Sequence, residues 1–130
     1  KLNLEKFVIF YGTKDNVYEF FDMCDFFIHS SYYEGFGNVI LEALNSKIKI
    51  ISTDSKYGPR ELLDNGRYGK LVEIGDFNKI FKEVVDNIHK DINYEDRKKW
   101  ISKKFSTEKN VKKYYELILN LYKKQYSNKN

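Results

Sequence analysis

Two hydrophobic patterns alternate along the chain. Residues 7–11 form a short, continuous apolar run, and shorter apolar runs lie within 25–29, 49–53 and 69–74, so these four segments are predicted as strands. Between and after these runs, apolar residues recur every three or four positions, which is the spacing of helices with one buried face. The pattern therefore predicts strands that alternate with helices.

Capping residues and the only proline place the predicted helices. Asp15, Asp76 and Ser106 are suitable N-caps, because their side-chain oxygens can accept from free backbone N–H groups. Pro59 suits the first turn of a helix. The predicted helices cover 15–23, 37–45, 59–63, a segment that begins after Asp76, 94–104, and a last one that begins after Ser106.

This alternation favours an α/β fold, in which a parallel sheet is flanked by helices. No internal repeat or proline-rich linker interrupts the 130 residues, and this length is typical of one domain. We therefore predict a single domain over residues 1–130, with a helical tail at about 91–126. Ligands of such sheets lie at the carboxyl ends of the strands. The segment 30–38, SSYYEGFGN, is a loop of that kind.

The composition excludes several classes of protein. Hydrophobic residues make up 42% of the chain and charged residues 32%, which is typical of a globular protein and not of a disordered one. No apolar run approaches the roughly 18 residues of a membrane-spanning helix. The single cysteine, Cys24, excludes an internal disulfide and a cysteine-rich zinc site. The two histidines are isolated in the sequence, and for His29 we favour a strand-end residue that packs or lines the cleft over a catalytic base.

The net charge of +4 is concentrated at the C-terminal end. Such a bias suits an anionic membrane surface or nucleic acid, and it also suits a solvated lysine face. No RNP-like aromatic motif, zinc-finger spacing or recognition-helix pattern accompanies it, so we predict no nucleic acid partner. The lysines of this region are Lys98, Lys99, Lys103, Lys104, Lys109, Lys112, Lys113, Lys123 and Lys124.

The glycines of the loop 30–38 point to a ligand. Gly35 and Gly37 permit backbone angles that other residues avoid, and they allow a ligand to approach the main chain closely. The helix that begins near Gly37 has free N–H groups at its start, which suit phosphate or sugar oxygens. Glycines before a helix also occur in simple turns, so both interpretations are open on the residues alone.

Two carboxylates accompany these glycines. Glu34 suits sugar hydroxyls, or a positive charge that develops during a reaction. Glu42 lies one helical turn after Asn38, on the face opposite Ile40 and Leu44, which we expect in the core. A carboxylate on that face is well placed to accept from the paired hydroxyls of a ribose. Solvated surface glutamates would give the same pattern.

The residues Glu34-Gly-Phe-Gly-Asn-Val-Ile-Leu-Glu42 resemble the E-x7-E motif of the retaining glycosyltransferases of the GT-B fold known as family four. The similarity extends to other blocks that occur in the same order: FYG, CDFFIHSS, IISTDSKYGPRELL, NGRYGKLVEIGD and KFSTE. Together the blocks cover most of the chain. Their order is similar to the C-terminal, donor-binding domain of that family, which is Rossmann-like.

This resemblance implies roles for the motif residues. Glu42 would hold the ribose hydroxyls of a nucleotide diphosphate sugar, and Glu34, the expected catalytic residue, would lie near the transferred sugar. The backbone N–H groups of the loop would meet sugar and diphosphate oxygens. The residues implied in substrate binding are Gly35, Phe36, Gly37, Asn38, Val39 and Glu42.

The resemblance also implies a larger enzyme. Its acceptor-binding N-terminal domain and an Arg and Lys pair that neutralises the diphosphate would precede Lys1, so we expect a truncated donor domain that is inactive alone. The expected reaction transfers a sugar to a glycan or lipid-linked acceptor, in polysaccharide, lipopolysaccharide or glycolipid synthesis. No cofactor or metal is expected. The expected location is cytoplasmic, with attachment to the cytoplasmic membrane face kept open.

Two alternatives stay open beside the glycosyltransferase. The first is a sugar-nucleotide epimerase of the GT-B type, which shares the fold and the ligand but needs acid and base groups that the sequence does not identify. The second is a non-catalytic module that binds nucleotide sugars or docks on a membrane. It is motivated by the lysines and tyrosines of the last predicted helix.

Overall fold

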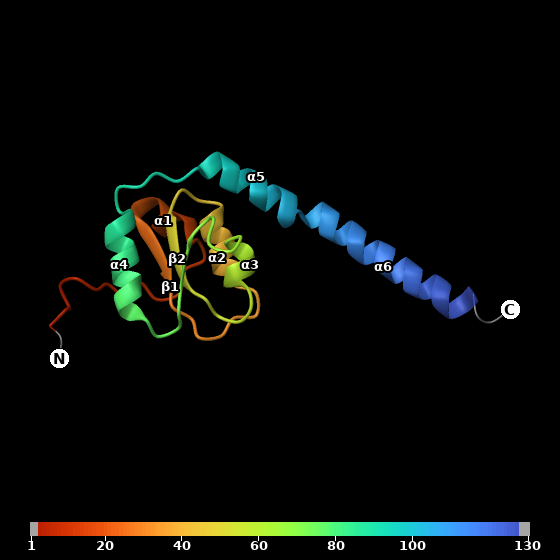
Figure 1. Cartoon of the computed structure of the whole chain (residues 1–130), viewed down its shortest axis with the longest axis horizontal. Helices are drawn as coiled ribbons and strands as arrows, with labels where there is room; N and C mark the ends of the chain where they lie inside the picture. The colour runs from red at the N-terminus through yellow and green to blue at the C-terminus, as the bar shows by residue number, and fades with distance from the viewer. Residues whose placement is uncertain (1–2, 128–130) are drawn as a thin grey trace. The chain divides into compact units, whose positions relative to one another are not determined.

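The computed structural model describes residues 3–127, and the side chains of all of these except 126 and 127. The chain divides into two units, with the boundary after Lys90. The first unit contains three strands, which are β1 (Phe26–His29), β2 (Lys49–Thr53) and β3 (Lys70–Val72). It also contains the helices α1 to α4, and the second unit contains α5 and α6 (Figure 1).

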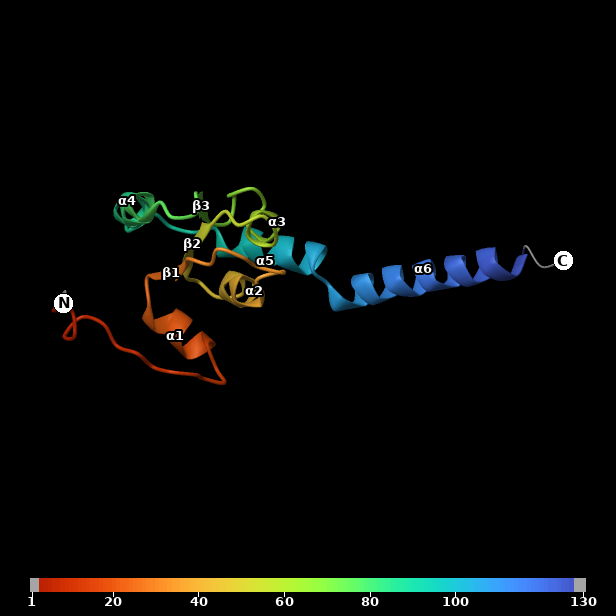
Figure 2. The same cartoon turned by 90° about the horizontal axis from the view of Figure 1, so that it is seen from below.

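The three strands form one parallel sheet in the order β1-β2-β3. Helix α4 (Phe77–Asn87) packs on one face against β2 and β3. Helices α2 (Asn38–Leu44) and α3 (Pro59–Leu62) lie on the other face (Figure 2). The predicted α/β class is therefore confirmed, as is the predicted parallel sheet flanked by helices.

Burial of apolar side chains explains this arrangement. Helix α2 places Ile40, Ala43 and Leu44 in the core, each with 0% exposure, as predicted for Ile40 and Leu44. On the opposite face of the sheet, Ile51 of β2 packs with Val72 of β3 and with Ile80 of α4. Removing these side chains from water is the main contribution to the stability of the first unit.

Most helices begin and end close to where the sequence predicted, because capping residues and Pro59 define their ends. Pro59 occupies the first turn of α3, and the turn that follows has positive φ at Asp64, Asn65 and Gly66. The side chain of Asp76 accepts from the N–H of Lys79 at 2.9 Å, as expected for the N-cap of α4. These ends depend on neighbouring residues, which is why sequence alone predicts them.

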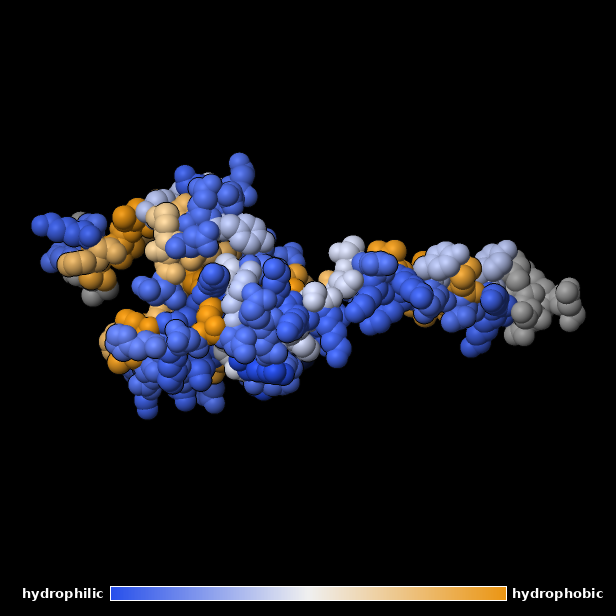
Figure 3. Space-filling view, turned by 90° about the horizontal axis from the view of Figure 1, so that it is seen from above, coloured by the Kyte–Doolittle hydropathy of each residue, from blue (hydrophilic) through white to orange (hydrophobic). Residues whose placement is uncertain are grey.

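The N-terminal segment differs from the prediction. The strand predicted at 7–11 does not form, and Phe7 and Phe10 are 82% and 93% exposed. Figure 3 shows an orange, hydrophobic surface over the N-terminal segment. A strand requires a neighbour for its backbone hydrogen bonds, and β1 is paired only with β2 among the described residues. An apolar run does not form a strand without such a neighbour.

The first helix also begins later than predicted. Helix α1 spans Tyr18–Met23 with Val17 at its N-cap, so Asp15 is not the cap. Instead, Asn16 Oδ1 accepts from the N–H of Tyr18 at 3.1 Å. An asparagine that bonds the backbone two residues later forms a local turn, which delays the start of the helix.

In the second unit, α5 spans Tyr94–Lys104 and α6 spans Thr107–Ser127. Ser106 Oγ accepts from the N–H of Lys109 at 3.3 Å, as expected of an N-cap. Apolar and hydrophilic side chains are both exposed along α6 (Figure 3). No helix among residues 3–127 is long and apolar enough to cross a membrane.

We expect Asp76→Ala to lower the free energy of unfolding by about 1 kcal/mol, because the N–H of Lys79 loses its acceptor. Asp76→Asn is the matched control, since an amide oxygen can still cap α4. Urea unfolding of the chain measures both variants. Equal unfolding midpoints for the parent and Asp76→Ala would contradict the assigned cap.

Candidate functional site at the carboxyl ends of β1 and β2

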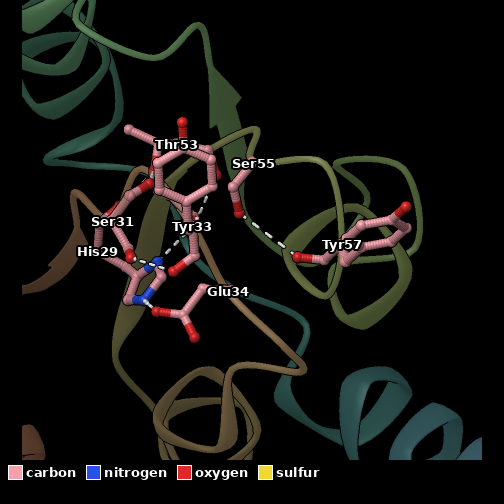
Figure 4. A network of polar contacts seen from close by, with 8 residues as sticks. His29, Ser31, Tyr33, Glu34, Thr53, Ser55 and Tyr57 are labelled. Atoms are coloured by element: carbon pink, nitrogen blue, oxygen red, sulfur yellow. Dashed lines mark hydrogen bonds and ion pairs between the residues drawn. The ribbon is translucent and has the colours of Figure 1, made fainter.

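The candidate site begins where β1 and β2 end. Because the strands are parallel and in register, His29 at the end of β1 lies beside Ser52 of β2. The loop 30–37 follows β1, and the loop 54–58 follows β2. Two segments that are distant in sequence therefore meet at one edge of the sheet (Figure 4).

His29 connects the sheet to the loop. Its Nδ1 lies 3.1 Å from Ser52 Oγ, and its Nε2 lies 2.9 Å from Glu34 Oε1. The side chain of His29 is 9% exposed and that of Glu34 is 25% exposed. Our interpretation of His29 as a strand-end residue is confirmed, but the sequence did not reveal its contact with Glu34. A histidine that ends a strand five residues before a motif glutamate is the signal that could have indicated it.

Two hydroxyl groups hold the backbone of the same loop. Thr53 Oγ1 donates to Ser31 O at 2.6 Å and lies 3.3 Å from His29 O. Ser31 Oγ in turn donates to Tyr33 O at 2.8 Å. Thr53 is 2% exposed, so this anchor belongs to the rigid core of the sheet. The loop before the glycines is thus attached to the core through side chains.

The order Ser52, His29, Glu34 resembles the triad of acyl-transfer enzymes, in which a histidine joins a serine nucleophile to a carboxylate. Burial argues against that chemistry here. Ser52 is 0% exposed, so its hydroxyl cannot meet a substrate carbonyl. Glu34, with 25% of its side chain exposed, is the most accessible member of the array.

The two loop glycines differ in their backbone. Gly37 has φ +88°, directly before α2, and a Cβ there would lie 3.2 Å from Ile40 Cδ1. Gly35 lies outside the left-handed region and has open space around it. Gly37 therefore uses the conformational freedom that both glycines offer, whereas Gly35 does not, and the open space around Gly35 agrees with the expected access of a ligand.

A third glycine, which the sequence analysis did not assign, joins the two loops. Gly58 has φ +88°, and a Cβ at this position would lie 2.2 Å from Phe36 O. The loop after β2 can therefore pack against the backbone of the glycine loop only because residue 58 lacks a side chain. This contact fixes the shape of the loop that contains Phe36.

The structure places Glu42 on α2, half-buried and on the helix that follows the loop. Its side chain forms no hydrogen bond or ion pair with another residue of the described part of the chain. Asn38 is exposed and begins the same helix, and Val39 is half-buried. A half-buried carboxylate without a protein partner is available to a ligand.

The nearby basic residues have partners within the protein. The guanidinium of Arg60 forms an ion pair with Asp54, and Lys56 Nζ lies 5.1 Å from the centre of the Tyr57 ring. Within residues 3–127, no three His, Cys, Asp or Glu side chains are grouped so that they could hold a metal ion.

Comparison with known proteins gives consistent matches. Residues 1–107 match the family described as "Glycosyl transferases group 1". The chain is 39% identical over 82 residues to N-acetylgalactosamine-N,N'-diacetylbacillosaminyl-diphospho-undecaprenol 4-alpha-N-acetylgalactosaminyltransferase of Campylobacter jejuni subsp. jejuni serotype O:2, which covers 63% of this chain and 22% of the relative. It is 30% identical over 118 residues to N-acetyl-alpha-D-glucosaminyl L-malate synthase of Bacillus anthracis, and the match covers 87% of this chain and 30% of the relative.

A solved structure agrees with these matches. The crystal structure of TarM superposes with a TM-score of 0.61 at 28% identity, and the match covers 69% of this chain and 19% of that one. The chain therefore spans less than a third of the length of each of these three proteins.

We expect Gly58→Ala to lower the free energy of unfolding by about 1–3 kcal/mol more than Gly75→Ala does, because only the first variant forces a Cβ against Phe36 O. Gly75 is the matched control, since its φ is +86° and its surroundings are open. Urea unfolding gives the stabilities, and amide NMR shifts show whether the change reaches the loop. Equal destabilisation by the two variants would contradict the tight loop contact.

Proposed function

The chain belongs to the group 1 glycosyl transferases and has part of their GT-B fold, and from this premise we propose that it forms the donor-binding part of a retaining glycosyltransferase. The reaction would transfer a sugar from a nucleotide diphosphate sugar to an acceptor hydroxyl, with retained configuration at the anomeric carbon. The chain alone would bind the sugar donor without transferring the sugar.

One observation carries this proposal. Glu34 lies at the carboxyl edge of the parallel sheet, with its carboxylate at 2.9 Å from His29 Nε2, and Glu42 follows on α2 with no side-chain partner among the described residues. The carboxyl edge of a parallel sheet is where α/β proteins bind nucleotides. The half-buried carboxylate of Glu42 would accept from the two ribose hydroxyls.

The loop between these carboxylates would bind the rest of the sugar donor. Gly35 lies in open space, so a sugar or diphosphate can approach its main chain. The N–H groups of Asn38 and Val39 belong to the first turn of α2, where no preceding carbonyl of the helix accepts them. We propose that these N–H groups, with those of Phe36 and Gly37, meet the sugar and diphosphate oxygens.

Glu34 would act on the charge that develops during transfer. As the bond to the diphosphate breaks, the sugar gains positive charge at its anomeric carbon and the leaving diphosphate gains negative charge. A carboxylate beside the sugar stabilises the first change, and backbone N–H groups stabilise the second. The proposal includes no metal ion or other cofactor.

The relatives indicate the class of acceptor. The Campylobacter jejuni relative is named for a sugar substrate on diphospho-undecaprenol. We therefore propose a glycan or lipid-linked acceptor, bound with the help of an N-terminal acceptor domain, and a role in polysaccharide, lipopolysaccharide or glycolipid synthesis. A lipid-linked acceptor would place the protein in the cytoplasm, at the membrane face.

Helix α6 supports attachment to that face as a second, compatible function. Val111, Tyr114 and Ile118 are 61%, 70% and 63% exposed, and they recur at helical spacing. Lysines such as Lys112 and Lys113 share the helix, and basic amphipathic helices bind anionic lipid. Pelleting with vesicles of anionic lipid tests this function. An absence of binding at both low and high salt would exclude it.

Titration with UDP, GDP and their sugar conjugates, followed by amide NMR shifts, tests the donor site. Shifts that cluster at residues 34–42 would support the proposal and identify the base. If the chain shows no amide shifts at millimolar ligand, the same titration is repeated on the full-length protein. An absence of amide shifts in the full-length protein would overturn the proposed function.

We expect Glu42→Ala to weaken nucleotide binding by about tenfold, because one good hydrogen-bonding carboxylate is lost from a half-buried site. Glu34→Ala should instead reduce kcat of the full-length protein and change nucleotide affinity little. Glu83→Ala, which removes a half-buried glutamate of α4 on the other face of the sheet, is the control. Calorimetry and steady-state kinetics separate these effects. Unchanged nucleotide affinity in Glu42→Ala would remove Glu42 from the site.

A further inference from the structure

The contact between His29 and Glu34 extends the site beyond the loop and helix motif. We propose that His29 is a positioning residue that fixes the carboxylate of Glu34 against the bound sugar donor, an inference that rests on the proposed function. His29 would not touch the substrate. It would act through Glu34, with its ring held by the buried core of the sheet.

The ring of His29 is held from two sides. It is the last residue of β1, and the register of the sheet places it beside Ser52 of β2, which is 0% exposed. Ser52 Oγ lies 3.1 Å from Nδ1, and the ring centre of Phe27 lies 6.1 Å from that of His29. With 9% of its side chain exposed, His29 has little freedom to turn.

The carboxylate of Glu34, by contrast, has one anchor. Glu34 lies in an irregular loop, and its single polar contact with the described residues joins Oε1 to His29 Nε2 at 2.9 Å. Its second oxygen, Oε2, therefore remains available to a ligand, and the exposed fraction of 25% leaves it accessible. Figure 4 shows the Glu34 carboxylate below the ring of His29, and Ser31 and Thr53, which hold the loop backbone, above it.

The contact with Glu34 requires a proton on Nε2, which donates to Oε1. The hydroxyl of Ser52 lies 3.1 Å from Nδ1 and donates to Thr53 O at 3.0 Å, so the Nδ1 side of the ring lies against the buried end of β2. A glutamate side chain loses three rotatable torsions when it is ordered, and a fixed partner removes that cost before the reaction begins. A carboxylate already in position stabilises a developing charge without reorganisation.

Two substitutions at residue 29 separate positioning from simple packing. In His29→Gln, the side-chain amide reaches about as far as Nε2 and can still donate to Glu34. In His29→Asn, the amide ends near the position of Nδ1, so it reaches Ser52 but not Glu34. We expect His29→Asn to reduce kcat of the full-length protein by about tenfold to a hundredfold, with KM for the sugar donor within about threefold of the parent. His29→Gln should retain most of the activity.

A double-mutant cycle shows whether His29 acts through Glu34. In the Glu34→Ala background, His29→Asn should cause no further loss of kcat. An equal loss in both backgrounds would overturn the inference, because the ring would then act by itself or through folding. Activity of His29→Asn equal to that of the parent would overturn it as well.

The NMR shifts of the ring nitrogens test the contact between His29 and Glu34 without an activity assay. We expect Glu34→Gln to move the ¹⁵N resonances of His29, while those of His89, the exposed second histidine, stay in place. Unchanged His29 resonances would overturn the inference whatever the kinetics show. A parent protein that transfers no sugar from UDP or GDP donors would overturn the proposed function instead, and the ring shifts would still decide the contact.

Discussion

The parallel register of β1 with β2 is the constraint on which the candidate site depends. It pairs His29 with Ser52, and it places the ends of both strands at one edge of the sheet. Two anchors of the loop 30–37 lie next to this pairing, namely the ring of His29 and the hydroxyl of Thr53. A register slip of one residue would turn these side chains to the opposite face of the sheet.

The carboxyl edge of the sheet combines buried, tightly packed residues with partly accessible carboxylates. Ser52 and Thr53 are buried, and Gly58 packs directly against the backbone of Phe36, so the two loops have little freedom where they meet. Glu34 and Glu42 remain partly accessible on the side where a ligand would bind. The proposed function would use both properties, because carboxylates that act on a sugar donor would have to be fixed before the charge of the reaction develops and would still have to reach the donor.

Most secondary structure could be predicted because its causes are local. Asp76 and Ser106 cap the helices that follow them, Pro59 begins α3, and the spacing of Ile40 and Leu44 defines the buried face of α2. The prediction at 7–11 was wrong for the opposite reason. An apolar run indicates that a segment can be buried in a sheet. A strand also needs a neighbouring strand for its backbone hydrogen bonds, and the run itself does not supply one.

The sequence by itself determined the α/β class, the boundaries of most helices and the motif from Glu34 to Glu42, because these depend on spacing and on residues close in the chain. Only the tertiary structure decided that His29 contacts Glu34, that Gly58 is needed where the two loops meet, and that Gly35 does not use its conformational freedom. Each of these facts depends on the pairing of two strands or on the packing of two loops. Such contacts join residues that are distant in sequence, so neither the periodicity of apolar residues nor the spacing of motif residues predicts them.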